Sequence, residues 1–252
     1  MNQQYFIKGR VLVWFSCGAA SAVAAKKSIE LYSDRWPVEV CNHDLSPSEH
    51  PDNKRFLADV ERWISQPIIS VTSTKYKDIW SLFEERKFIK HPHGAICTTE
   101  LKVIPGREYT DRWDWSVFGF TADEGDRIEA FESRNPELRC FWPLRDEGIT
   151  KPDCFRILVD AGIELPAMYK LGYKNNNCIG CVKGGVGYWN KIRRDFPAYW
   201  NRMNSVSHKL QNPFVKYRGD RRYLDELPPD AGKYDSEPSI ECGPVCVQPG
   251  DE

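Results

Sequence analysis

Short apolar runs of strand length alternate with amphipathic stretches over the first 147 residues. The apolar runs lie at residues 11–15, 38–41, 68–71, 116–120 and 140–142. Stretches with helical periodicity lie between them, at residues 22–32, 52–64 and around 79–83. Strands that alternate with helices predict an α/β fold with a parallel sheet and crossover helices. Ligands of such sheets bind at the carboxyl ends of the strands.

The pattern changes near residue 148. Thr150 and Asp153 have the spacing of a capping box, which predicts a helix over residues 150–162 that a glycine ends. A turn with two cysteines, an aromatic helical region and a polar, proline-rich tail follow. We therefore predict two domains, an α/β domain at residues 8–147 and a helical, cysteine-rich region at residues 148–252.

The first strand run leads into the sequence SCGAAS at residues 16–21, and a helical stretch follows at once. Backbone N–H groups at such a turn are unpaired and the helix dipole adds positive charge, so the turn can bind an anion. Ser16 and Ser21 can donate from their hydroxyls, and Gly18 allows close approach to the backbone. The run has neither the Walker pattern nor Gly-x-Gly-x-x-Gly. An ordinary strand-to-helix turn is the alternative.

Composition restricts the classes of function. The chain has 252 residues, of which 28% are charged, and its formal net charge of −1 excludes a global basic field. Residues 191–194 and 218–222 are local basic stretches, which can equally be solvated surface. No run approaches about 18 apolar residues, so we expect no membrane span. Without an export signal, the nine cysteines favour metal or thiol chemistry in the cytoplasm over disulfides.

Four of the cysteines have chelating spacing. Cys178 and Cys181 form a C-x-x-C, and Cys242 and Cys246 form a C-x-x-x-C. Together they predict a four-thiolate site for zinc or a [4Fe–4S] cluster, and spacing does not separate the two. A redox dithiol at the C-x-x-C is an alternative. Three others lie in apolar periodic runs and are expected in the core, namely Cys41, Cys140 and Cys154.

Several segments resemble, in order, the motifs of one family. They are the loop at residues 16–21, CTTELKVIP at 97–105, GFTADE at 119–124 with Arg127 after it, FWPL at 141–144 leading to CIGC at 178–181, and ECG at 241–243. The chain thus resembles the PAPS reductase (phosphoadenylyl-sulfate reductase) family of the PP-loop, adenine nucleotide α-hydrolase-like superfamily. It is similar overall to PAPS reductase-like proteins of phage and mobile elements, from about residue 11 to residue 246.

The resemblance implies a five-stranded parallel, Rossmann-like sheet of the HUP type with flanking helices, plus a C-terminal helical, cysteine-rich region. It implies that residues 8–147 bind an adenine nucleotide: ATP, adenylyl sulfate or PAPS. The implied nucleotide-binding residues are Ser16, Gly18, Ala19, Ser21, Asp44, Lys102, Gly119, Glu124 and Arg127. In this set, Lys102 and Arg127 would neutralise anionic oxygens, and Asp44 or Glu124 would orient the ribose or a metal such as Mg²⁺.

The resemblance also assigns roles to cysteines. It implies Cys97 and Cys242 as catalytic thiols, with Cys97 as an alternative ligand beside Cys178 and Cys181. Cys242 is a nucleophile in this reading, or a ligand together with Cys246. The loop has Cys17 and Ala20 where the common PP-loop has Gly and Asp, so cleavage of Mg–ATP stays open.

Three functions follow from these features. The first is a PAPS/adenylyl-sulfate reductase-like oxidoreductase that uses thiol- or cluster-assisted sulfur chemistry. The second is an ATP-dependent sulfurtransferase that adenylates and then thiolates a nucleic acid or nucleoside. The third is a non-catalytic nucleotide-binding module with structural zinc. The expected partners are the nucleotide, a thiol or persulfide donor protein and, for the second function, a nucleic acid; a dimer is compatible with all three.

Overall fold

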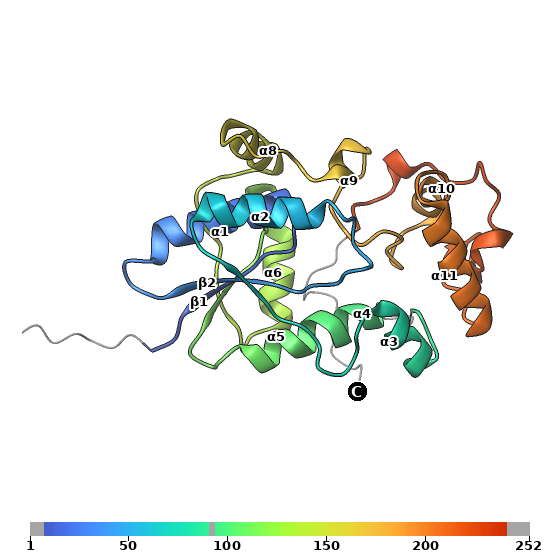
Figure 1. Cartoon of the computed structure of the whole chain (residues 1–252), viewed down its shortest axis with the longest axis horizontal. Helices are drawn as coiled ribbons and strands as arrows, with labels where there is room; N and C mark the ends of the chain where they lie inside the picture. Colours follow the sequence, from blue (N-terminus) through green and yellow to red (C-terminus); the bar gives the residue numbers. More distant parts are fainter. Residues whose placement is uncertain (1–7, 91–93, 241–252) are drawn as a thin grey trace, which may run out of the picture. The chain divides into compact units, whose positions relative to one another are not determined.

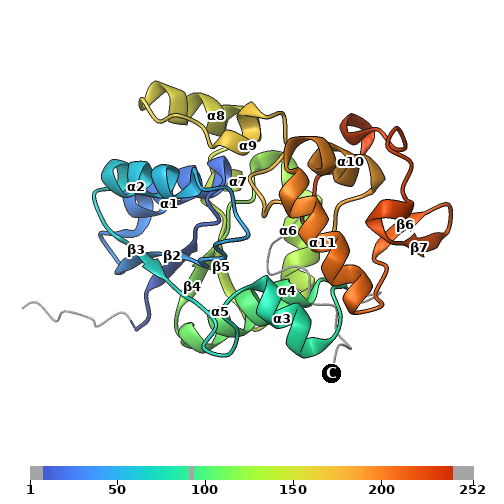
Figure 2. The same ribbon diagram turned by 45° about the vertical axis from the view of Figure 1, so that its right-hand side comes forward.

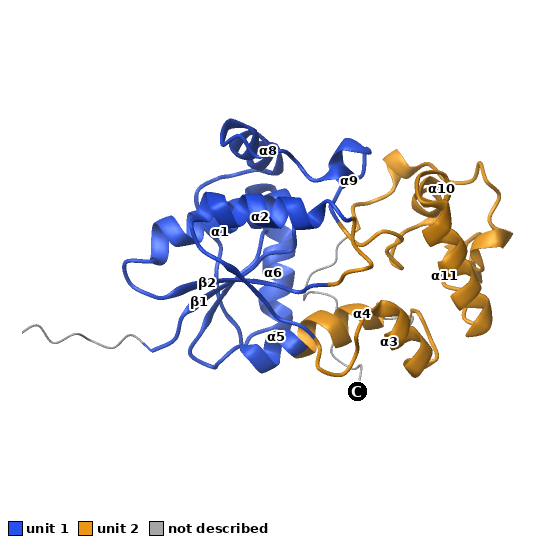
Figure 3. Ribbon diagram, viewed as in Figure 1, with its two compact units in different colours: residues 1–44, 51–72, 105–176 blue, residues 45–50, 73–104, 177–252 orange. Residues whose placement is uncertain are grey.

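The computed structural model of the chain describes residues 8–90 and 94–240. These residues fall into two compact units, coloured separately in Figure 3. Unit 1 consists of residues 1–44, 51–72 and 105–176, and unit 2 of residues 45–50, 73–104 and 177–252.

Unit 1 is built on a five-stranded parallel sheet (Figure 1). Its strands are β1 (Val11–Trp14), β2 (Val38–Asn42), β3 (Ile68–Ser70), β4 (Trp115–Val117) and β5 (Arg139–Phe141). The strand order is β3-β2-β1-β4-β5, so β1 is central, with Val11 opposite Val38 on one side and Trp115 on the other. The predicted α/β fold with a five-stranded parallel sheet is confirmed.

Helices cover both faces of this sheet. They are α1 (Ala19–Tyr32), α2 (Asn53–Ile64), α5 (Ile104–Tyr109), α6 (Gly125–Arg134), α7 (Pro143–Asp146), α8 (Lys151–Asp160) and α9 (Ala167–Lys170), with a 3-10 turn at Ala122–Glu124. Successive side chains of a strand point to opposite faces. Accordingly, Val11 and Val13 pack in the cluster that holds α1, α2 and α8, whereas Leu12 packs with Cys41 and Tyr109 of α5. Figure 2 shows α1 and α2 on one side of the strands and α5 on the other.

The predicted capping box at Thr150 is present. The side chain of Thr150 accepts a hydrogen bond from the N–H of Asp153, and Asp153 Oδ2 accepts one from the N–H of Thr150 at 2.9 Å. Helix α8 therefore begins at Lys151, and it ends before Gly162, which has a φ of +73°. Helix α8 packs on α1 and belongs to unit 1, so the boundaries of the compact units differ from residues 8–147 and 148–252. The division into domains at residue 148 stays a prediction.

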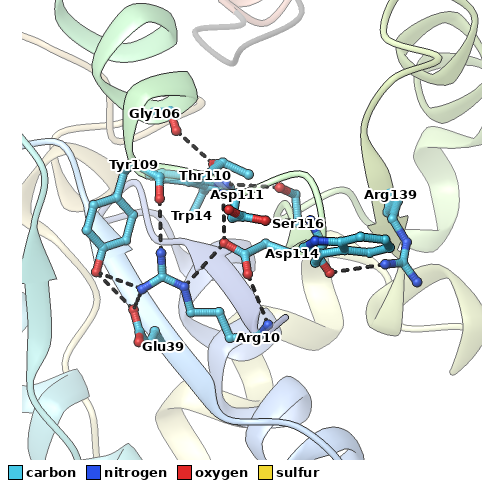
Figure 4. Close-up of polar contacts among 11 residues, drawn as sticks. Arg10, Trp14, Glu39, Gly106, Tyr109, Thr110, Asp111, Asp114, Ser116 and Arg139 are labelled. Atoms are coloured by element: carbon cyan, nitrogen blue, oxygen red, sulfur yellow. Dashed lines mark hydrogen bonds and ion pairs between the residues drawn. The ribbon is translucent and has the colours of Figure 1, made fainter. Parts of the chain in front are cut away.

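A network of paired charges lies beside the amino ends of β1 and β4 (Figure 4). Arg10 Nη1 lies 2.6 Å from Glu39 Oε2, and Arg10 Nε lies 3.2 Å from Oδ2 of the buried Asp114. Arg10 Nη2 donates to the carbonyl of Tyr109 at 3.0 Å. Burial alone would lower the pKa of Arg10, but the hydrogen bonds and charges of Glu39 and Asp114 raise it above its ordinary value. The network thus ties β1, β2 and the start of β4 to α5.

Unit 2 is mainly helical. Its elements are α3 (Ile79–Arg86), α4 (Ile96–Thr98), a π-helical turn (Thr99–Val103), α10 (Val186–Asp195), α11 (Pro197–Lys209), the antiparallel hairpin of β6 (Val215–Tyr217) and β7 (Asp220–Arg222), and 3-10 turns at Leu224–Glu226 and Tyr234–Ser236. Its core includes the fully buried Trp189, which packs edge-on against Phe214 at 5.3 Å between ring centroids.

The polar tail after Leu227 packs by hydrogen bonds rather than through a core of its own. Gly185, the residue before α10, provides no capping side chain. Instead, Glu237 accepts hydrogen bonds from the N–H groups of Gly187 at 2.6 Å and Tyr188 at 3.1 Å. A carboxylate at a helix N-terminus also interacts favourably with the helix dipole. Capping of α10 by the side chain of Glu237 therefore holds this part of the tail in place.

Within the described ranges, no helix combines the length and the apolar character that crossing a membrane would require.

Candidate functional site

The loop after β1 is closed by the hydroxyl of Ser21. Ser21 Oγ accepts a hydrogen bond from the N–H of Ser16 at 3.1 Å and donates to the carbonyl of Gly18 at 2.9 Å. The hydroxyls of Ser16 and Ser21 lie 3.2 Å apart. The structure therefore brings together the two serines and the glycine that the sequence assigned to phosphate binding.

Helix α1 begins directly at this loop, with Gly18 as its N-cap and without a side-chain cap. Its first turn contains no acidic residue. The N–H of Ala19 donates to the phenol of Tyr169 at 3.3 Å. Because the first turn of α1 has no carboxylate to neutralise the positive end of the helix dipole, this end is suited to an anion.

The loop after β4 runs against the start of α1. A Cβ atom on Gly119 would lie 2.7 Å from the backbone nitrogen of Ser21 and 2.8 Å from its Cα, so only glycine fits there. The strand order reverses between β1 and β4, which is the switch point where parallel α/β sheets bind ligands. The two loops at this point are therefore packed backbone to backbone.

Buried asparagines support the loop from behind. Asn176 Nδ2 donates to the carbonyl of Cys17 at 2.6 Å and to Asn53 Oδ1 at 2.8 Å, and Asn42 Nδ2 donates to the carbonyl of Phe15 at 2.8 Å. Cys17 is buried and has a φ of +56°, a left-handed backbone conformation that residues other than glycine rarely adopt. Such strain persists only where neighbours fix the backbone, and it clusters at functional loops.

Glu124 and Arg127 lie next to each other after β4. Glu124 Oε2 accepts hydrogen bonds from the N–H and the hydroxyl of Thr121 at 2.9 and 3.0 Å, and Glu124 also pairs with Arg127. The guanidinium of Arg127 lies 4.7 Å from the centroid of the Phe120 ring. The carboxylate expected to orient a ribose or a metal is therefore used as a helix cap, a role that the sequence analysis did not include.

The two remaining predicted nucleotide-binding residues belong to different units. Asp44 is exposed and follows β2 in unit 1. Lys102 is half-buried on the π-helical turn Thr99–Val103 of unit 2. Such turns are rare and frequently occur at functional sites. No sequence signal pointed to this one.

The C-x-x-C turn of unit 2 is held firmly. The phenol of Tyr188 accepts from the N–H of Cys181 at 2.9 Å and lies 3.2 Å from the carbonyl of Cys178. Gly180 has a φ of +66°, and a Cβ there would lie 2.6 Å from the ring of Tyr199. The backbone of the turn is therefore fixed by two aromatic side chains.

Cys97 lies near the same tyrosine. Burial raises the pKa of Tyr199 well above its ordinary value, and the neighbouring sulfurs of Cys178, Cys97 and Cys181 raise it further. All three thiols are thus near enough to Tyr199 to act on the charge of its phenol. Among residues 8–90 and 94–240, no three His, Cys, Asp or Glu side chains stand in the arrangement of a metal site. Cys242 and Cys246, the other half of the predicted set, lie outside the described residues.

The cysteines expected in the core behave as such. Cys41 and Cys154 are fully buried, and Cys140 is partly buried. Burial raises the pKa of each of these three thiols to about 12. They therefore stay protonated at neutral pH and are poor nucleophiles.

Sequence reasoning missed the residues that support the loop and the C-x-x-C turn. They are Asn42, Asn53, Asn176, Tyr169, Tyr188 and Tyr199. Each acts through a contact that the local pattern does not specify, such as the one across the 159 residues from Cys17 to Asn176. In the sequence alone, the one local signal for these supporting residues is an asparagine beside a turn of small residues.

Comparison with known proteins finds likeness to solved structures but no match in sequence. No protein family model matches the chain, and no curated protein matches it. A similar solved structure is the phosphate complex of phosphoadenylyl-sulfate (PAPS) reductase from Candida auris, at 11% identity and a TM-score of 0.47, over 67% of this chain and 81% of that chain. The α/β fold assigned to unit 1 rests on its own sheet order and register.

Proposed function

We propose that the chain is a PAPS reductase-like enzyme that binds an adenine nucleotide at the loop of residues 16–21. The observation that carries the proposal is the construction of this loop at the switch point of the sheet. Two hydroxyls, a glycine N-cap and a helix N-terminus without an acidic first turn meet there. This set of groups suits the phosphate or sulfate oxygens of adenylyl sulfate, PAPS or ATP.

Further residues extend the proposed nucleotide site. The N–H group of Gly18 and the hydroxyl of Ser16 would hold anionic oxygens. The N–H of Ala19 and the hydroxyl of Ser21 would do so by exchanging their present bonds to Tyr169 and to the carbonyl of Gly18. Arg127 would supply positive charge, which it shares with Glu124. Asp44 would contact the ribose or a metal such as Mg²⁺.

The proposed sulfur chemistry uses thiols. A cysteine thiolate would attack the sulfur of adenylyl sulfate, forming an S–S bond as the S–O bond to the nucleotide breaks and the nucleotide leaves. A second thiolate would attack the enzyme sulfur of this thiosulfonate and release sulfite, leaving a disulfide that an external dithiol reduces. Cys242 and Cys97 are the proposed thiols.

The C-x-x-C turn fits a soft metal group. Two cysteines on a fixed backbone turn, with Cys97 close to the same tyrosine, match the donors that zinc and iron–sulfur clusters prefer. Cys178 and Cys181 would hold it, and either Cys97 or the pair Cys242 and Cys246 would complete the ligand set. The cysteine that does so would then be a ligand in place of a catalytic thiol. A cluster would supply electrostatic or redox support to sulfur chemistry, and zinc would supply structure.

The decisive experiment is sulfite release. The anaerobically purified chain is incubated with adenylyl sulfate or PAPS and a dithiol, and sulfite is measured beside iron, zinc and acid-labile sulfide. Sulfite that depends on nucleotide and dithiol supports the proposal. Pyrophosphate release from ATP without sulfite would instead assign an ATP-dependent sulfurtransferase. Nucleotide binding without turnover, in a protein that holds zinc, would assign a non-catalytic module.

Thiol labelling tests the assignment of cysteines. At pH 8, Cys41, Cys140 and Cys154 should resist iodoacetamide, because their raised pKa values, about 12, leave almost no thiolate below that pH. Cys97 and Cys178, which are partly exposed, should react once metal is removed by a chelator. Mass spectrometry of the digested protein measures both. Labelling of the three core cysteines ahead of Cys97 and Cys178 would contradict the assignment.

A further inference from the structure

Basic side chains concentrate in one stretch of unit 2. Residues 183–222 contain ten lysines and arginines against two aspartates, whereas the whole chain has a net charge of −1. Four of the ten lie on the β6–β7 hairpin (Figure 2), at Lys216, Arg218, Arg221 and Arg222. The positive field is therefore local.

The hairpin sets like charges against each other. Lys216 lies directly opposite Arg221 in the antiparallel register, and both are exposed. Like charges in this position destabilise a strand pair. At the tip, Arg218 has a φ of +50° and Gly219 a φ of +96°. In two-residue hairpin turns of this kind, the first of these two positions normally holds asparagine or glycine. Neither Lys216 nor Arg218 forms an ion pair with any residue that the structure describes.

Two further lysines lie near the base of the hairpin. Arg221 Nη1 donates to the carbonyl of Lys90 at 3.5 Å. Partial burial lowers the pKa of Lys90, and the charges of Arg221 and Lys183 lower it further, while Cys181 opposes them. Arg221 and Lys183 thus lie close enough to Lys90 to disfavour its charge. A ligand with several negative charges would offset this repulsion.

We propose that the β6–β7 hairpin, with Lys90 and Lys183, binds the sugar–phosphate backbone of a nucleic acid strand. Tyr217 lies between Lys216 and Arg218 in the sequence, and the guanidinium of Arg218 lies 5.2 Å from the centroid of its ring. Tyr223, which follows Arg222, already stacks on His208 at 4.0 Å between ring centroids. Arginine forks bind phosphates in a bidentate manner, and aromatic rings next to them stack on bases. A membrane surface would favour apolar side chains at the tip, where this chain has Arg218 and Gly219.

Fluorescence anisotropy of the full-length chain tests the proposal. The probe is a labelled single-stranded RNA or DNA of about 20 nucleotides, titrated at about 50 and 200 mM salt. With roughly three or four phosphates contacted, the logarithm of the affinity should fall with log salt at a slope of about −2 to −3. The double variant Lys216→Glu/Arg218→Glu should bind at least tenfold more weakly. Its thermal midpoint should not fall, because Lys216→Glu places opposite charges across the strand pair.

A matched control separates the hairpin from overall charge. The double variant Arg35→Glu/Arg134→Glu makes the same change of net charge at two exposed arginines of unit 1, which form no ion pair within the described residues. It should alter affinity less than twofold.

Three results would overturn the proposal. The first is an equal loss of affinity in the control variant. The second is wild-type binding to poly-glutamate or phosphatidylserine vesicles that is as tight as binding to the oligonucleotide. The third is no oligonucleotide binding at the lower salt. The proposal is independent of the nucleotide loop, so the absence of sulfite release leaves it standing, and the reverse also holds.

Discussion

The two ends of the five-stranded sheet in unit 1 are built from different chemistry. At the amino end, Arg10 is paired with two carboxylates, Glu39 and Asp114, so its positive charge is fully offset (Figure 4). At the carboxyl end, Ser16 and Ser21 present hydroxyls beside a helix N-terminus that its own first turn leaves without an acidic residue. Paired charges hold strands together, whereas small side chains and backbone N–H groups leave room and polarity for a ligand. We therefore expect the amino end to contribute stability and the carboxyl end to bind the proposed ligand.

The largest effect is expected from Asp114→Ala at the amino end. This buried carboxylate accepts from the N–H and Nε of Arg10 and from the N–H of Asp111. Its removal leaves Arg10 with one carboxylate partner fewer in a partly buried site and should cost about 3–5 kcal/mol of unfolding free energy. Urea denaturation measures the loss, and nucleotide affinity of the folded fraction should not change.

Asp34→Ala is the control for this variant. Asp34 is an exposed carboxylate of the same unit, and its removal should change the unfolding free energy by less than about 0.5 kcal/mol. If Asp114→Ala weakened nucleotide binding by tenfold without unfolding the protein, the separation of the two ends would be wrong.

An intermediate effect is expected from Gly119→Ala at the carboxyl end. The added Cβ would lie 2.7 Å from the backbone nitrogen of Ser21, so the loop and α1 must move apart. We expect a loss of about 1–3 kcal/mol and at least tenfold weaker nucleotide binding, measured by thermal unfolding and calorimetry. Gly125→Ala is the matched control, because nothing lies within 4 Å of its Cβ position and alanine favours the helix. An unchanged nucleotide affinity in Gly119→Ala would remove the loop from the binding site.

The fold could be predicted from the sequence because its strands are continuous apolar runs. All five predicted strands are present. The central strand β1 is buried on both faces, whereas the edge strands β3 and β5 are partly exposed. The predicted boundaries of strands and helices were less accurate where side-chain packing or capping determines where an element begins or ends. The fourth run was expected to reach Phe120, but β4 ends at Val117. Beyond it, Phe118 and Phe120 turn to pack against Phe131, at centroid distances of 4.9 and 6.0 Å. The first helix begins at Ala19 rather than residue 22, because Gly18 serves as its N-cap.

The candidate site could be predicted only where its residues are local. Ser16, Gly18 and Ser21 lie within one turn, so their spacing was informative. The use of Glu124 as a cap for Thr121, and of Glu237 as a cap for α10, depends on which carboxylate the folded chain brings to a helix end. Residue types alone do not distinguish a capping carboxylate from a ligand-binding one.

The smallest and most specific effect is expected from Ser21→Ala, with Ser28→Ala as its partner on the same helix. Both serines are buried on α1, but Ser21 Oγ binds the N–H of Ser16 and the carbonyl of Gly18, whereas Ser28 Oγ has no hydrogen-bond partner among the described residues. Loss of the Ser21 hydroxyl should cost about 1 kcal/mol, and Ser28→Ala should be neutral or stabilising, because a buried hydroxyl without a partner is unfavourable. Only Ser21→Ala should also weaken nucleotide binding. Equal effects of the two variants on affinity would mean that the hydroxyl of Ser21 serves the helix alone, and the carboxyl end would lose its distinction from the amino end.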